Sequence, residues 1–169
     1  MRLPAIDLGL MSEHLAAHEG VIYKLEIYLN NVQNKTFRKI LKAHIDTLRN
    51  HVLVMLMLIN PNRVEKVSLP DIEKMNMDVP LGKLTPWEKN MVLESRFTAN
   101  AMGSNNFNSA SMMKNDNVKN IHLQMSYQDI HFQKMYNKLI TAADVEFVPM
   151  ASLEEQWKAL RKYQHVMSQ

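Results

Sequence analysis

The sequence predicts an all-α protein in which four helices form a bundle and a short fifth helix follows. The six prolines lie at positions 4, 61, 70, 80, 86 and 149, so two long stretches, 5–60 and 87–148, contain no proline. Each stretch is long enough for two helices, because proline inside a helix costs about 3 kcal/mol. A third observation, the long segment between the two stretches, predicts how the helices are connected.

The first stretch predicts a helical hairpin over residues 12–60. Ser12 is a suitable N-cap, and Glu13 beside it complements the helix dipole. Asparagines at 30, 31 and 34 predict the turn, and a second helix follows over about 35–59, where an Asn-Pro pair ends it. Helical spacing places one stripe of that second helix on the inward face: Phe37, Leu41, His44, Leu48, His51 and Met55.

The second stretch predicts another hairpin, over residues 86–143. Thr85 is the cap, Pro86 takes the first helical position and Glu88 closes a capping box. An Asn-Asp-Asn turn at 115–117 separates this helix from the next, which runs over about 118–142. The run Ala-Met-Gly-Ser-Asn-Asn-Phe-Asn within the third helix has poor helix propensity, so we expect its small residues to allow tight packing against a neighbour.

A short C-terminal helix is predicted over residues 152–167. Ser152 and Glu155 have the spacing of a capping box. With this helix, the whole chain 1–169 is expected to form a single domain.

The segment 61–85, which contains three of the six prolines, predicts the topology. Antiparallel neighbours in a bundle need only about 2–8 connecting residues. An extended segment of this length reaches up to about 80 Å, whereas the second helix is about 37 Å long. It can therefore run the length of the bundle and start the third helix at the far end, which is the ferritin-like arrangement. The alternative is a disordered linker between hairpins that pair differently.

Composition excludes several classes of function. The chain has no cysteine, which excludes disulfides, thiolate metal sites and cysteine nucleophiles. The net charge is +3 with scattered basic residues, so no nucleic-acid partner is expected. No apolar run approaches the roughly 20 residues that span a bilayer, and the N-terminus does not resemble a signal peptide. We expect a protein that is made in the cytoplasm and does not associate with membranes.

The histidines suggest a degenerate di-metal site. A ferritin-like site takes a Glu from each of two helices and Glu-x-x-His from each of the other two. His51 and His131 stand where the two motifs would end, but Leu48 and Gln128 replace the glutamates. A single divalent ion, Fe, Mn or Zn, remains chemically plausible because imidazole and carboxylate suit these metals. Its candidate ligands are His18, Glu19, His51, Glu94 and His131.

The favoured interpretation is that the histidines are structural. His44 and His51 are then core or boundary residues hydrogen-bonded to amides or carboxylates across the bundle, while the pair His14 and His18 near the start of the first helix faces solvent. Phosphate-binding glycine loops, nucleophile elbows and His-Glu-x-x-His motifs are all missing from the sequence. We therefore expect no cofactor, no catalytic residue and no enzymatic activity.

Placed on these helices, the chain resembles the ferritin-like coat F family, the spore coat proteins of endospore-forming bacteria, over roughly residues 12–150. The residues that carry the resemblance are His18-Glu19, Tyr28-Leu29, His44, His51-Val52, Met55, Asn60-Pro61, Leu84-Thr85, Glu88-Lys89, Gln128, His131-Phe132, Tyr136 and Pro149.

The resemblance implies a structural component of the spore coat that is made in the mother cell and deposited in the coat. Such a protein acts through contacts with other coat proteins, and no catalytic residues transfer with the resemblance. A homodimer is expected because helical bundles of this kind commonly pair side by side. Exposed aromatic residues are candidate contacts: Tyr23, Tyr28, Trp87 and Trp157. Two alternatives stay open: a metal-binding or redox protein with a degenerate di-metal site, and a sensor that holds a small molecule among the polar side chains of the third helix.

Overall fold

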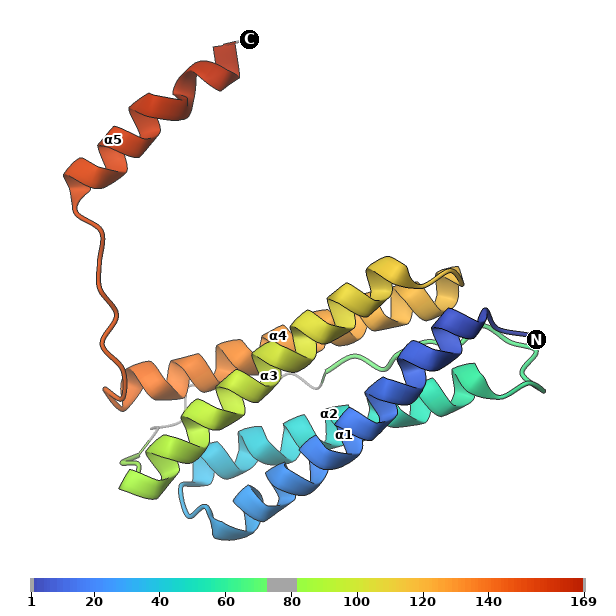
Figure 1. Ribbon diagram of the computed structural model, residues 1–169. Coiled ribbons are helices and arrows are strands. Elements are labelled where there is room, and N and C mark those ends of the chain that lie inside the picture. Colours follow the sequence, from blue (N-terminus) through green and yellow to red (C-terminus); the bar gives the residue numbers. More distant parts are fainter. Residues whose placement is uncertain (1, 73–81, 169) are drawn as a thin grey trace.

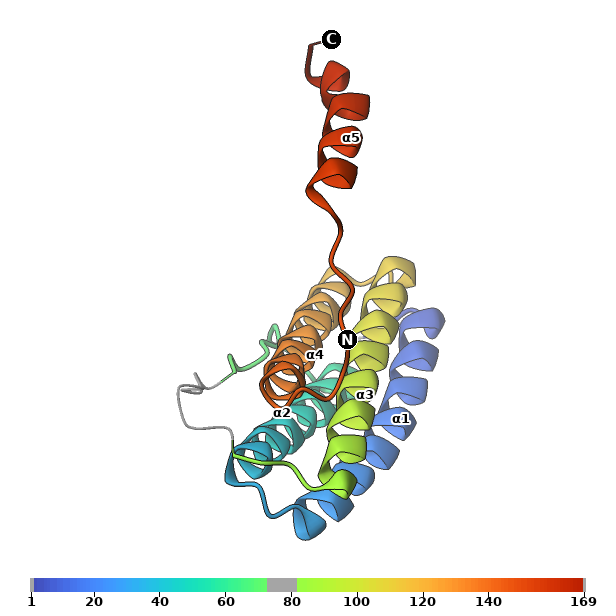
Figure 2. The same ribbon diagram turned by 90° about the vertical axis from the view of Figure 1, so that its left-hand side faces the viewer.

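The computed structural model describes residues 2–72 and 82–168, and within these ranges it is all-helical, with no strand. Four long helices lie side by side as a bundle, and a fifth stands away from it at the end of an extended segment (Figures 1 and 2). The helices are α1 (Ala5–Asn31), α2 (Lys35–Ile59), α3 (Pro86–Met112), α4 (Asp116–Ala142) and α5 (Leu153–Tyr163), and a 3₁₀ turn (Gln164–Ser168) ends the described chain.

Most predicted helix boundaries are confirmed, including both capping boxes, at the starts of α3 and α5. The predicted start of α1 is wrong. The helix begins at Ala5 after Pro4, and Ser12 lies inside it, donating a hydrogen bond to the carbonyl oxygen of Leu8 (2.9 Å). Pro4 carries the fixed φ that suits a helix start. No side-chain cap marks this start, which is held instead by a tertiary contact of Asp7.

The core follows the predicted stripe of α2, because all six of its members have a side chain that is fully buried. Two apolar clusters fill the bundle. One surrounds Phe37, Phe132 and Tyr136, and the other surrounds Met55 and Met125 toward the opposite end.

The predicted tight packing of α3 is confirmed at Gly103. A Cβ atom there would come within 3.0 Å of the Ile130 side chain on α4, and the Ser126 hydroxyl donates to the Gly103 carbonyl oxygen (2.7 Å). A side chain at this position would require the Ile130 side chain and the backbone at Ser126 to give way, so the glycine allows a close approach of the two helices.

Glu88 joins the α1–α2 turn to the start of α3. Its carboxylate, 3% exposed, accepts hydrogen bonds from the backbone N–H groups of Gln33 (2.9 Å), Asn34 (2.7 Å) and Thr85 (2.8 Å). Burial alone would raise the pKa of Glu88, but these hydrogen bonds outweigh it and hold the pKa below its usual value.

At the opposite end of the bundle, the carboxylate of Asp7 accepts from the backbone N–H groups of Lys114 (2.9 Å) and Asn115 (2.8 Å) in the α3–α4 turn. Just beyond the end of α2, Arg63 donates to the side chain of Asn117 (3.0 Å) at the start of α4. The end of α2 and the start of α3 therefore lie at opposite ends of the bundle.

Glu88→Ala is expected to destabilise the bundle by about 3 kcal/mol, because a buried carboxylate that satisfies several backbone donors is lost. Chemical denaturation followed by circular dichroism measures this change. Glu155→Ala is the matched control, because Glu155 holds the same capping-box position in the exposed helix α5. Equal unfolding midpoints for the Glu88 variant and the wild type would show that this junction does not stabilise the bundle.

Candidate functional site

The bundle has an unusually polar interior, to which all four helices contribute. The buried polar side chains of this interior, called the polar interior below, are His14, His18, His44, His51, Ser95, Asn106, Ser109, His122, Gln128 and Asp129. The expectation that His14 and His18 face solvent is wrong, since they are 6% and 0% exposed. Met11, three residues before His14, and Leu25, seven residues after His18, are fully buried on the same face of α1, which therefore points inward.

His18 and His51 meet at the centre of the polar interior. Nε2 of His18 lies 3.3 Å from Nδ1 of His51. The other ring nitrogens face oxygens: Nδ1 of His18 is 2.7 Å from the His14 carbonyl oxygen, and Nε2 of His51 is 2.8 Å from Oε1 of Gln128. Gln128 in turn donates through Nε2 to the Pro70 carbonyl oxygen (2.7 Å). The expected hydrogen bond from His51 to an amide across the bundle is thus confirmed.

Both of these imidazoles are neutral at physiological pH. Burial lowers the pKa of His18 to about 4, although its hydrogen bond to the His14 carbonyl opposes the shift. Burial, followed by the nearby His18, lowers the pKa of His51 to about 3, against the hydrogen bond to Gln128.

A second pair of histidines, His14 and His122, lies next to the first. Their ring centroids are 5.2 Å apart, and Nε2 of His14 is hydrogen-bonded to the Ser109 hydroxyl (2.8 Å). Nδ1 of His122 donates to the Val118 carbonyl oxygen (3.0 Å), and Nε2 has no hydrogen-bond partner among the described residues. Burial lowers the pKa of His122 to about 4.

His44 is a core histidine, as the favoured interpretation of the sequence expects, but its partner is a tyrosine hydroxyl and not an amide or carboxylate. Its ring stacks on Phe132 with centroids 4.5 Å apart and planes 14° apart, and Nδ1 lies 3.0 Å from the Tyr136 hydroxyl. Burial lowers the pKa of His44 to about 3.

Asp129 is a buried carboxyl group that the sequence analysis did not identify. It is fully buried, and Oδ2 accepts a hydrogen bond from Nδ2 of Asn106 (2.8 Å). Burial raises the pKa of Asp129 to about 8, against the effect of this hydrogen bond. Its spacing from Met125 and Phe132 on the apolar face of α4 is the signal that could have placed it inside.

The five predicted metal ligands are not brought together. His18 and His51 meet, but Glu19 lies exposed on the outer face of α1. His131 is half-buried at the edge of α4, where burial and the nearby Lys134 and Lys138 lower its pKa.

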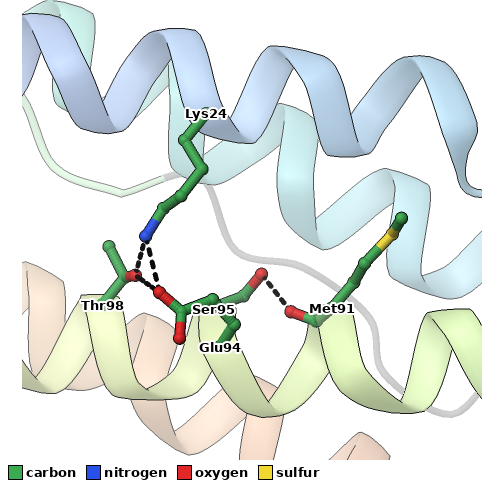
Figure 3. A network of polar contacts seen from close by, with 5 residues as sticks. All are labelled: Lys24, Met91, Glu94, Ser95 and Thr98. Atoms are coloured by element: carbon green, nitrogen blue, oxygen red, sulfur yellow. Dashed lines mark hydrogen bonds and ion pairs between the residues drawn. The ribbon is translucent and has the colours of Figure 1, made fainter.

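Glu94 also lies outside the polar interior. Its carboxylate forms an ion pair with Nζ of Lys24 (2.9 Å), which donates to Thr98 as well (Figure 3). The inward face of α3 passes instead through Ser95, one residue further along, whose hydroxyl donates to the Met91 carbonyl oxygen (2.7 Å). One residue corresponds to about 100° around a helix, so the predicted face was out of phase.

Within residues 2–72 and 82–168, no group of three or more His, Asp or Glu side chains is arranged to hold a metal ion. The carboxylate-rich di-metal site of ferritin-like enzymes is therefore not assembled in this part of the chain.

The surface carries an apolar groove of about 660 Å³ on the outer face of α1 and α2. Its apolar lining is Leu15, Ala16, Ile22, Tyr23, Val52 and Leu56, and its charged rim is Glu19, Glu26 and Arg49. Arg49 is paired with Glu26 (2.6 Å). No helix in the described part of the chain is long and apolar enough to cross a membrane.

Comparisons with protein-family models, with curated proteins and with solved structures gave no match.

Proposed function

We propose that the protein is a non-enzymatic structural component that acts through protein–protein contacts made by its exposed apolar surfaces. The observation that carries this proposal is α5. Its 11 residues include no buried residue, although Leu153, Trp157 and Leu160 share one face and are 51–74% exposed. A helix this short is marginal in water unless its apolar face packs on something. The geometry therefore favours a helix that docks on another surface.

We propose that this face of α5, called the apolar stripe below, docks into the α1–α2 groove of a second copy of the chain. The groove offers apolar side chains from both helices, and its rim carries the carboxylates of Glu19 and Glu26. The last turn of α5 carries Arg161 and Lys162, which complement this rim. Exchange of α5 between two chains would form a symmetric homodimer.

The four-helix bundle supports the same proposal through its connectivity. The end of α2 and the start of α3 lie at opposite ends of the bundle, as a ferritin-like crossover requires. Deposition in a spore coat, after synthesis in the mother cell and together with other coat proteins, is supported by the sequence resemblance.

The predicted aromatic contacts divide into two groups. Tyr23, Trp87 and Trp157 are 68%, 75% and 55% exposed and are available to a partner. Tyr28 is half-buried against the core, so its contribution to a contact is smaller.

Trp157→Glu is expected to dissociate the dimer, because it places a charge on the apolar stripe. Loss of one such anchor weakens an interface by at least about 2 kcal/mol, or about 30-fold in the dissociation constant. Sedimentation equilibrium of the full chain measures the change. The control is Trp87→Glu, which changes a more exposed tryptophan at the start of α3, outside both α5 and the α1–α2 groove. A monomeric wild type, or a Trp157 variant that dimerises like the wild type, would contradict the proposal.

A further inference from the structure

The contact between His18 and His51 does not form an ordinary hydrogen bond. A carbonyl oxygen only accepts, so Nδ1 of His18, 2.7 Å from the His14 carbonyl oxygen, must carry the ring hydrogen of the neutral imidazole. Nε2 of His18 then has a lone pair and no hydrogen, and it is this atom that faces His51.

His51 is in the same situation. Its Nε2 faces Oε1 of Gln128 at 2.8 Å, which again only accepts, so Nε2 carries the hydrogen and Nδ1 has the lone pair. The amide of Gln128 cannot be reversed, because its Nε2 donates to the Pro70 carbonyl oxygen at 2.7 Å and a reversal would bring two acceptors together. In the neutral state, two lone pairs therefore face each other across 3.3 Å.

From this geometry we propose that Nε2 of His18 and Nδ1 of His51 are two ligands of a single tetrahedral divalent metal ion of the zinc type. The Zn–N bond is about 2.0–2.1 Å, so two nitrogens on the edge of such a tetrahedron lie about 3.3–3.4 Å apart. The observed 3.3 Å matches this edge. A square-planar ion would bring adjacent nitrogens to about 2.9 Å, and a linear one would separate them by about 4 Å.

The surroundings of both rings also fit metal ligands. A histidine that binds a metal usually donates its other N–H to a carboxylate, a backbone carbonyl or a water, which sets the tautomer and orients the ring. His18 donates to a backbone carbonyl within α1 in this way, and for His51 the side-chain amide oxygen of Gln128 from α4 takes the same place. Both rings are fully buried and are held before any ion arrives. The other coordination positions are left to water or a small anion.

This site differs from the one expected from sequence, because it uses no carboxylate and only two of the five predicted ligands. It is also independent of the proposed dimer contacts, which lie on the outer surface.

The test is equilibrium dialysis of the untagged full chain against ZnCl₂, followed by elemental analysis. We expect about one zinc per chain, with none retained by His18→Gln or His51→Gln. His44→Gln is the matched control: it changes another fully buried histidine of α2, outside the pair, and is expected to keep its zinc. Dialysis against Mg²⁺, which prefers oxygen ligands, should give no retention. A folded wild type without zinc, or zinc retained by both pair variants, would overturn the proposal.

A second measurement needs no variant and so does not depend on whether the variants fold. Nitrogen-15 NMR of the imidazoles should show His18 protonated at Nδ1 and His51 protonated at Nε2 before metal is added. Zinc should then shift Nε2 of His18 and Nδ1 of His51. A hydrogen on Nε2 of His18 in the neutral protein would contradict the facing lone pairs and the site with them.

Discussion

Acidification from pH 6.5 to 4.5 is expected to destabilise the bundle, and replacing His44 by Gln is expected to reduce this sensitivity. In the unfolded chain a histidine has a pKa near 6.5, whereas burial lowers the pKa of His44 to about 3 and that of His122 to about 4. Below pH 6.5 the unfolded chain therefore binds protons that the folded chain does not. Each of these imidazoles lowers the free energy of unfolding by about 1.4 kcal/mol per pH unit in this window.

Asp129 acts in the opposite direction, because its folded pKa is raised. Over the same window it increases stability by about 1.4 kcal/mol per pH unit as the pH falls, which offsets one imidazole. Asp129 therefore cancels only one imidazole, and His18 and His51, whose pKa values burial also lowers, add to the loss of stability.

Urea denaturation at pH 6.5, 5.5 and 4.5 measures this sensitivity. The slope of stability against pH should be about 1.4 kcal/mol per unit shallower in His44→Gln than in the wild type, with an unchanged m-value. The slope is the readout because a packing defect at residue 44 shifts the whole curve without tilting it. Parallel curves would show that His44 titrates alike in the folded and unfolded chains.

Asp129→Asn is expected to stabilise the protein increasingly as the pH rises from about 4 to 8. The pKa of Asp129 is raised from 3.8 to about 8 on folding. A raised pKa gives stability that is complete below the unfolded value and is lost as the pH rises to the folded value. The wild type should therefore lose about 1.4 kcal/mol per pH unit relative to the variant in this window, and the difference should level off above pH 8.

The contact with Asn106 explains why the variant keeps its packing. Oδ1 of Asn106 and Oδ1 of Asp129 are both buried without a hydrogen-bond partner among the described residues. One proton on Oδ1 of Asp129 would join them and complete a two-armed pair with the bond from Nδ2 of Asn106. An amide at 129 can make the same two-armed pair without ionising. Denaturation at pH 5, 7 and 9 tests this, and a constant difference between variant and wild type would refute the raised pKa.

Local signals in the sequence predicted most of the fold, because helices form where the apolar stripe of α2 and the capping boxes predict them. The apolar stripe of α2 has a clear helical period, and the capping boxes of α3 and α5 need only residues three positions apart. The start of α1 could not be predicted in this way. It is stabilised by the bonds of Asp7 to the distant α3–α4 turn, which leave no local pattern.

The candidate site was predicted less completely than the fold. On α3 the series of Asn, Ser and Gly residues has little apolar contrast, so Glu94 rather than Ser95 was placed on the inward face. On α4 the Glu-x-x-His spacing predicted that His131 is the inward residue, whereas the residue buried in the structure is Asp129. His18 and His51 were identified, but only the structure shows that Nε2 of His18 and Nδ1 of His51 face each other at 3.3 Å.

The proposal that α5 acts as a docking helix is tested most directly by hydrogen exchange of its backbone amides at two protein concentrations. We predict that amides within Leu153–Tyr163 are protected at high concentration, where two chains exchange their C-terminal helices, and exchange rapidly at low concentration. The amides of α2 in the core should stay protected at both. Rapid exchange of α5 at every concentration would contradict the proposed function, and protection that does not depend on concentration would replace the dimer by docking of α5 within its own chain.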